Sequence, residues 1–339
     1  MPRLISTTRA FSGVSAAFAL VLLAAVHAYA GKPVAPDTEG GREGGTLFAR
    51  ATAITYDTSR NGSGEGAGRM AVAGGDWTPP ACWYAPTMTP EEFRQRYADY
   101  LGTPLHTGKA EAVETHEEMY GEDSQYKDHN IDKQGEGMWW EGVMNPSTPA
   151  GDPGKLACDE PPFWVENGET PDIENVISPE ILAGLAYEQI QVPTTEFELS
   201  PADEQTVNLD TWVWSANADF APVAVTASVE ALGIEATTTA RPVSFRIEPG
   251  TRDAELHPVS GECAIAADGV IGEPYEKGRS AQTPPCGLTY LRAGDYELRA
   301  TVTWEVAWEG SGGTGGDLPD GTFEAAQSVT VREVQSIVR

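Results

Sequence analysis

Basic residues are scarce in this sequence, and their scarcity limits the partners that the protein can have. There are 22 Lys and Arg against 51 Asp and Glu, a formal net charge of −29. Such an acidic chain repels phosphate backbones and anionic headgroups, so we expect no nucleic acid partner and no binding to anionic membranes. Calcium, basic proteins and amine-bearing surfaces remain compatible with this charge, as does a simple role in extracellular solubility.

Long apolar runs are missing after residue 30, so no later segment is predicted to span a membrane. The apolar run FSGVSAAFALVLLAAV (11–26) follows Arg3 and Arg9 and precedes the small-residue motif AYA (28–30). This order is typical of a cleaved signal peptide, with an uncleaved signal anchor as the alternative. We therefore predict a signal peptide over 1–30, no membrane span after its cleavage, and a secreted, extracellular protein.

Cysteines are few, and no C-x-x-C motif is present, which disfavours redox chemistry and zinc ribbons. The four cysteines are Cys82, Cys158, Cys263 and Cys286. An even number in an exported chain predicts disulfides, and three pairings are possible. We favour Cys82–Cys158 with Cys263–Cys286, because each bridge then closes a loop within one predicted region.

Established catalytic motifs are also missing. There is no G-x-S-x-G elbow, and GSGEGA (62–67) lacks the strand–turn–helix context of a dinucleotide site. His116-Glu117 opens the zinc-protease pattern H-E-x-x-H, but Tyr120 stands where the second histidine belongs. We name no catalytic residue and predict no cofactor, with calcium as the one possibility.

The calcium possibility is a run of oxygen-bearing side chains at alternate positions, namely Asp128, Asn130 and Asp132. A tight turn would bring such ligands to one side of the chain. The EF-hand pattern then fails, because Lys133 and Trp139 occupy its glycine and glutamate positions. The alternative is a turn in which the Asp and Asn side chains bond to their own backbone.

Composition divides the predicted mature chain into three parts. Residues 31–75 are rich in glycine and are predicted to form a flexible leader, apart from one weak strand over 46–57. Residues 76–191 carry helix start signals at Thr89-Pro90 and Ser178-Pro179, so we expect a helical and irregular region closed by a disulfide. Residues 192–339 are predicted to be all β.

The clearest strand is YELRATVTWEVAW (296–308), in which apolar residues alternate with mostly polar ones. This alternation predicts a strand with one buried face, which would include Trp304 and Trp308. At least five further segments of similar pattern, separated by Gly, Pro or Asp, indicate an antiparallel sandwich. The predicted fold class is α+β: a small disulfide-closed helical region followed by an immunoglobulin-like β-sandwich.

Two resemblances accompany this prediction. AGDYELRATVTW (293–304) resembles a strand of PKD and other immunoglobulin-like domains. The segments WTPPACWYAPTMTPEEF, GMWWEG, PPFWVENG, SPEILAGLAYEQI, NLDTWVW and PPCGLTYLRAGDY resemble an uncharacterised family of secreted proteins from streptomycete-type actinobacteria. That likeness covers residues 76–339 and implies export and architecture, but no catalytic residue.

These observations favour a non-enzymatic binding or structural protein of the cell envelope or of a secreted assembly. Its partner would be a protein or a component of the envelope. The alternative is an extracellular hydrolase that uses carboxylates within 115–141, beside Trp139 and Trp140.

Overall fold

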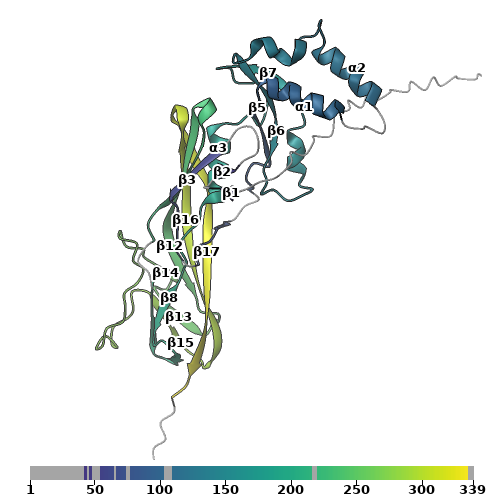
Figure 1. The fold of residues 1–339 in the computed structure, drawn as a ribbon. Coiled ribbons are helices and arrows are strands. Elements are labelled where there is room, and N and C mark those ends of the chain that lie inside the picture. Colours follow the sequence, from purple (N-terminus) through teal and green to yellow (C-terminus); the bar gives the residue numbers. More distant parts are fainter. Residues whose placement is uncertain are drawn as a thin grey trace, which may run out of the picture. The chain divides into compact units, whose positions relative to one another are not determined.

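The computed structural model describes residues 42–43, 46–47, 54–64, 66–73, 77–102, 109–215 and 220–334 (Figure 1). All of these belong to one compact unit. Within them, no helix has the length and apolar character needed to cross a membrane. The predicted signal peptide lies outside the described residues.

Strands are the commonest element of the described chain, which also has three α-helices and four short 3-10 helices. The α-helices are α1 (Pro90–Gly102), α2 (Lys109–Tyr120) and α3 (Pro179–Gln189), and the 3-10 helices are η1 (Lys127–Lys133), η2 (Pro153–Ala157), η3 (Glu230–Leu232) and η4 (Ser311–Gly313). The strands are β1 (Arg42–Glu43), β2 (Thr46–Leu47), β3 (Ile54–Arg60), β4 (Ala71–Val72), β5 (Cys82–Met88), β6 (Gly137–Met144), β7 (Phe163–Glu166), β8 (Phe197–Ser200), β9 (Glu204–Thr206), β10 (Asp210–Ser215), β11 (Val223–Val229), β12 (Ile234–Glu248), β13 (Ala254–His257), β14 (Glu262–Cys263), β15 (Gly287–Tyr290), β16 (Gly294–Gly310) and β17 (Thr314–Arg332).

The largest sheet has ten strands, and its main path runs β1-β2-β3-β11-β12-β16-β17-β4. Its longest pairing is the antiparallel hairpin of β16 and β17, which extends from Gly294 opposite Val331 to Gly310 opposite Thr314. On β16, alternate side chains from Leu298 to Val306 are fully buried. The predicted strand with one buried face is thus confirmed, and it is longer than its sequence pattern indicated.

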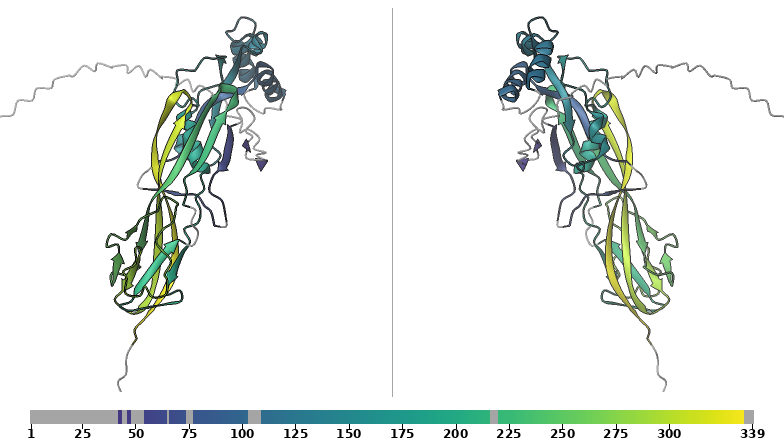
Figure 2. Two further views of the ribbon diagram at one scale, coloured as in Figure 1. Left: turned by 90° about the vertical axis from the view of Figure 1, so that its left-hand side faces the viewer. Right: turned by 90° about the vertical axis from the view of Figure 1, so that its right-hand side faces the viewer.

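A second, four-stranded sheet has the order β13-β15-β10-β8 and contacts the first (Figure 2). The rings of Tyr290 on β15 and Tyr296 on β16 stack with their centroids 5.1 Å apart. The Cys263–Cys286 disulfide closes the loop that precedes β15. All pairings in this sheet are antiparallel, so the mostly antiparallel β character is confirmed.

The smallest sheet, β5-β6-β7, belongs to the predicted helical and irregular region. The Cys82–Cys158 disulfide ties β5 to the loop after η2, so both bridges have the favoured pairing. Both helix start signals are also confirmed. Thr89 forms a capping box with Glu92 at the start of α1, and Ser178 Oγ accepts from the Ile181 amide at the start of α3.

Four strands of the main sheet, β1 to β4, come from the segment predicted as a flexible leader, and β2 and β3 overlap the weak strand predicted there over 46–57. β3 pairs with β11, and β4 pairs with β17 at Thr322 and Gly321. α3 also reaches this sheet, because the Thr238 hydroxyl on β12 donates to the Ala183 carbonyl at 2.9 Å. The predicted region boundaries therefore fall inside one connected core.

Trp212 on β10 corrects one detail of the sequence pattern. If Val207, Leu209 and Val213 formed the inner face of their strand, Trp212 and Trp214 would lie outward, yet Leu209 is 57% exposed and Trp212 is 2% exposed. Tyr275 and Arg279, from the loop closed by Cys263–Cys286, pack on the Trp212 ring. This loop buries the outward face of the strand at Trp212. The alternation of residues along a strand cannot predict that a distant loop will pack on it.

Candidate functional site

Aromatic and histidine side chains gather beside β6 in a second, smaller core, which we call the aromatic–histidine cluster. Phe93 of α1 stacks on the fully buried Trp139 of β6, with centroids 4.2 Å apart. The other members are Met88, Tyr97, Met119, Tyr120, Tyr126 and Trp164, with His116 and His129 in ring contact with them.

Three consecutive residues of η1 have left-handed backbone angles, and this turn directs His129 inward. Asp128, His129 and Asn130 have φ of 43°, 61° and 60°. Left-handed angles cost about 1–2 kcal/mol per non-glycine residue, least for Asp and Asn. The Trp139 indole nitrogen donates to the His129 carbonyl at 3.0 Å and holds the turn in place. Both His129 and Asn130 are buried as a result.

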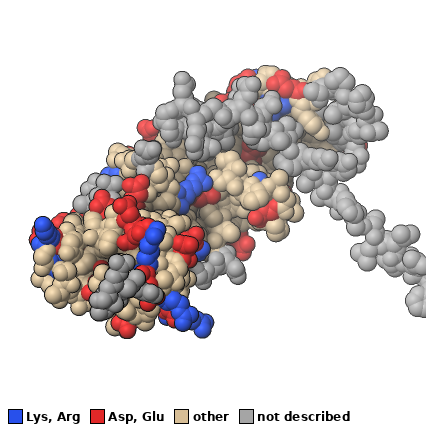
Figure 3. All heavy atoms as spheres, turned by 90° about the horizontal axis from the view of Figure 1, so that it is seen from below, with Lys and Arg blue, Asp and Glu red and all other residues tan. Residues whose placement is uncertain are grey.

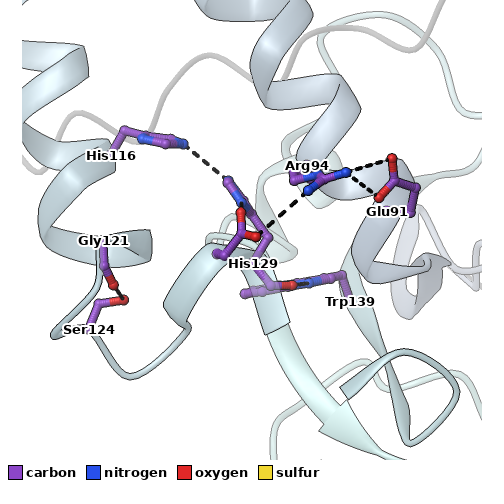
Figure 4. A network of polar contacts seen from close by, with 8 residues as sticks. Glu91, Arg94, His116, Gly121, Ser124, His129 and Trp139 are labelled. Atoms are coloured by element: carbon purple, nitrogen blue, oxygen red, sulfur yellow. Dashed lines mark hydrogen bonds and ion pairs between the residues drawn. The ribbon is translucent and has the colours of Figure 1, made fainter. Parts of the chain in front are cut away.

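The two histidines point toward each other (Figure 4). His116 lies on α2 and His129 on η1, and their Nε2 atoms are 3.1 Å apart. The Tyr120 ring stacks on the His129 ring at 4.5 Å and lies 5.3 Å from the His116 ring. Imidazole nitrogens of this kind can ligate metal ions.

Burial controls the ionisation of this pair. It lowers the pKa of His116, an effect that Glu117 opposes. Burial also lowers the pKa of His129, and the neighbouring His116 lowers it further against the opposing charge of Asp128. Both imidazoles are therefore neutral at neutral pH. Burial raises the pKa of the Tyr120 phenol, so Tyr120 is also neutral.

Glu141 and Asp128, two of the carboxylates within 115–141 where a hydrolase site was predicted, face arginines. Glu141 receives two hydrogen bonds from Arg96 Nη1, at 2.7 and 2.9 Å. Arg94 binds Glu91 and lies 3.7 Å from Asp128. The indoles of Trp139 and Trp140 are 0% and 4% exposed, so this face is closed by packed aromatic rings.

The calcium candidates have three different surroundings. Asp128 is exposed and faces Arg94, Asn130 is buried, and Asp132 is exposed without an ion pair to an arginine among the described residues. The described residues contain no group of three His, Cys, Asp or Glu arranged to hold a metal ion. The left-handed angles of Asp128 and Asn130 are those of the alternative, a tight turn. Calcium binding by this turn stays a prediction.

A shallow, open surface hollow of ≈ 630 Å³ lies at the connected end of the β16–β17 hairpin. Trp308 lines it and is only half-buried, although its parity on β16 predicts full burial. The reason is its partner across the hairpin, Gly316, which has no side chain to cover the indole. Glu309 and Asp317 add two carboxylates to the lining. The alternation of residues along the strand therefore did not predict that Trp308 is partly exposed. The run of glycines after Trp308 was the only sequence feature that could have indicated it.

Both disulfides indicate an oxidising environment. Acidic groups are spread over the face drawn in Figure 3.

The comparisons with known proteins add no identification: no family model, no curated protein and no solved structure matches this chain.

Proposed function

We propose that this chain is a secreted, non-enzymatic binding or structural protein of the cell envelope or of a secreted assembly. Its β-rich part would be an immunoglobulin-like sandwich that presents the β16–β17 hairpin, and its family would be the streptomycete-type secreted family that the sequence resembles. Two disulfides and a mostly antiparallel scaffold support this proposal.

The Trp308 hollow is the observation that carries the proposal. A half-buried indole on a paired hairpin is a typical contact for a partner, because an aromatic ring buries a large area with few rotatable bonds. Glu309 and Asp317 beside it favour a basic partner, and a cation could also lie over the indole face. We infer that the partner is a basic protein or an amine-bearing component of the envelope.

A pull-down from the native cell envelope tests this function. The purified chain should recover a specific partner, and Trp308→Ala should lose most of that recovery. Leu209→Ala removes an exposed apolar side chain from the turn before β10, outside the lining of the hollow, and should keep the recovery. Recovery that is equal for all three proteins, with and without calcium, would contradict the proposal.

The hydrolase alternative is tested in parallel, by incubating envelope polymers with the wild type and with Glu141→Gln. The closed face at Trp139 and the pairing of Glu141 with Arg96 lead us to expect no release of soluble fragments. Release that Glu141→Gln abolishes would favour the hydrolase.

A further inference from the structure

We propose that His116 and His129 bind one divalent transition-metal ion of the zinc, copper or nickel class, with both Nε2 atoms as ligands. The inference concerns the aromatic–histidine cluster and does not depend on partner binding at Trp308.

The distance between the two nitrogens fits a shared metal ion. Two ligands about 2.0–2.1 Å from one ion, at angles between square-planar and tetrahedral, lie roughly 2.9–3.4 Å apart. His116 Nε2 and His129 Nε2 are 3.1 Å apart and come from two separate elements. Imidazole nitrogen is a preferred ligand for zinc, copper and nickel, whereas calcium prefers oxygen.

A hydrogen bond between the two rings explains the distance but leaves His129 incompletely bonded. Whichever ring donates, His129 Nδ1 is buried without a hydrogen-bond partner, because Asp128 Oδ1 is 3.8 Å away. With a metal on both Nε2 atoms, Nδ1 carries the proton and faces this carboxylate. A carboxylate behind a ligating histidine is the usual arrangement in metal sites, and a small rotation of Asp128 would complete it.

Other buried polar atoms without partners lie in the same part of the chain. Six such side-chain atoms occur among the described residues, and they include His129 Nδ1, the Asn130 amide nitrogen and the Trp164 indole nitrogen. Buried polar groups are otherwise almost always hydrogen-bonded. Asn130 adjoins His129 in the left-handed turn, and Trp164 packs on Trp139. The Asn130 and Trp164 nitrogens are N–H donors, which a metal ion cannot satisfy, so the two Nε2 atoms and His129 Nδ1 carry the proposal.

The site has two histidine ligands, so its remaining coordination positions are open to solvent or to an added ligand. His116 is only half-buried, which leaves a route to the pair from outside. Closed structural zinc sites use four protein ligands, whereas sites with open positions can exchange ligands. We therefore expect reversible binding of added metal.

Titration calorimetry of the purified chain with Zn²⁺ tests the site. We expect one equivalent of zinc to bind, and affinity to fall by more than about 100-fold in His116→Gln and in His129→Asn, since even changes behind the ligands cost 10–100-fold. His257→Gln is the matched control. His257 lies on β13 of the four-stranded sheet, outside the aromatic–histidine cluster, so this variant should keep full zinc binding.

His129 is buried, so its variant could unfold, and the half-buried His116→Gln keeps the test decisive. Cu²⁺ bound to the wild type should show an electron paramagnetic resonance pattern from two equatorial nitrogens, and His116→Gln should lose it. The proposal is overturned if no one-equivalent event is seen, or if His116→Gln binds zinc as tightly as His257→Gln.

Discussion

At the scale of single residues, partly buried charged groups carry an energetic cost in the folded state, and Glu188 is an example. Glu188 of α3 is half-buried and accepts a hydrogen bond from the buried Asn145 amide at 3.0 Å. Burial raises the pKa of Glu188, and the Asn145 bond and the charge of Arg69 only partly offset it. The ionised carboxylate is thus disfavoured in the folded state.

The consequence is a pH-dependent cost. Because the pKa of Glu188 is higher in the folded than in the unfolded state, its protonated form stabilises the fold at pH values below the unfolded pKa. That stabilisation is lost as the pH rises through the folded pKa. We expect Glu188→Gln, which keeps an acceptor for Asn145, to raise the Tm at pH 7 by roughly 2 °C and to change little near pH 4. Thermal melts from pH 4 to 7 measure this.

Glu180→Gln is the matched control, because Glu180 starts the same helix but is exposed. It should give no gain at pH 7. A loss of stability in Glu188→Gln that is the same at pH 4 and pH 7 would show that the charge carries no cost.

At the scale of elements, caps and alternation make several parts of the fold predictable from sequence. The start of α3 follows from Ser178-Pro179-Glu180, and the buried face of β16 follows from its period of two. The weak strand predicted over 46–57 overlaps β3, but β4 could not be predicted, because the glycine-rich sequence around it shows no buried face and its order comes from pairing with β17. Local sequence does not encode such distant partners.

The same reason explains the histidine pair. His116 was readable as a metal ligand, but H-E-x-x-H places the second histidine one helical turn away, where Tyr120 stands. The second imidazole instead comes from η1, turned inward by three left-handed residues. A spacing of thirteen residues across two elements is not a motif that the sequence can reveal.

The cap of α3 offers a test at this scale. Ser178 Oγ accepts from the Ile181 amide at 3.3 Å, so Ser178→Ala should lower the free energy of unfolding by about 1 kcal/mol. Ser178→Thr keeps the hydroxyl and should lose much less. Urea denaturation measures both, and an equal loss for the two variants would rule out the capping role.

At the scale of the whole molecule, the described residues form one connected unit of three sheets, which includes a long hairpin and two disulfides. The bridges span 76 and 23 residues. If they act by restricting the unfolded chain, they contribute about 4.5 and 3.4 kcal/mol. Both serve to hold segments whose own helices and sheets are short.

Removing each disulfide separately tests whether the longer loop contributes more to stability. The double variant Cys82→Ser with Cys158→Ser should lose more stability in urea than Cys263→Ser with Cys286→Ser, by about 1 kcal/mol. The reverse order would mean that packing in the folded state, such as that of the loop over Trp212, outweighs loop length.

The central claim is that the hollow beside Trp308 contacts a partner in the cell envelope. Photo-crosslinking tests it most directly, with benzoylphenylalanine placed at the position of Thr314, which lines the hollow, or at the position of Val259, which is 91% exposed elsewhere. We predict a discrete covalent adduct from position 314 that disappears when Trp308→Ala is added, and none from position 259. Identical adducts from both positions, or no adduct from position 314, would contradict the claim.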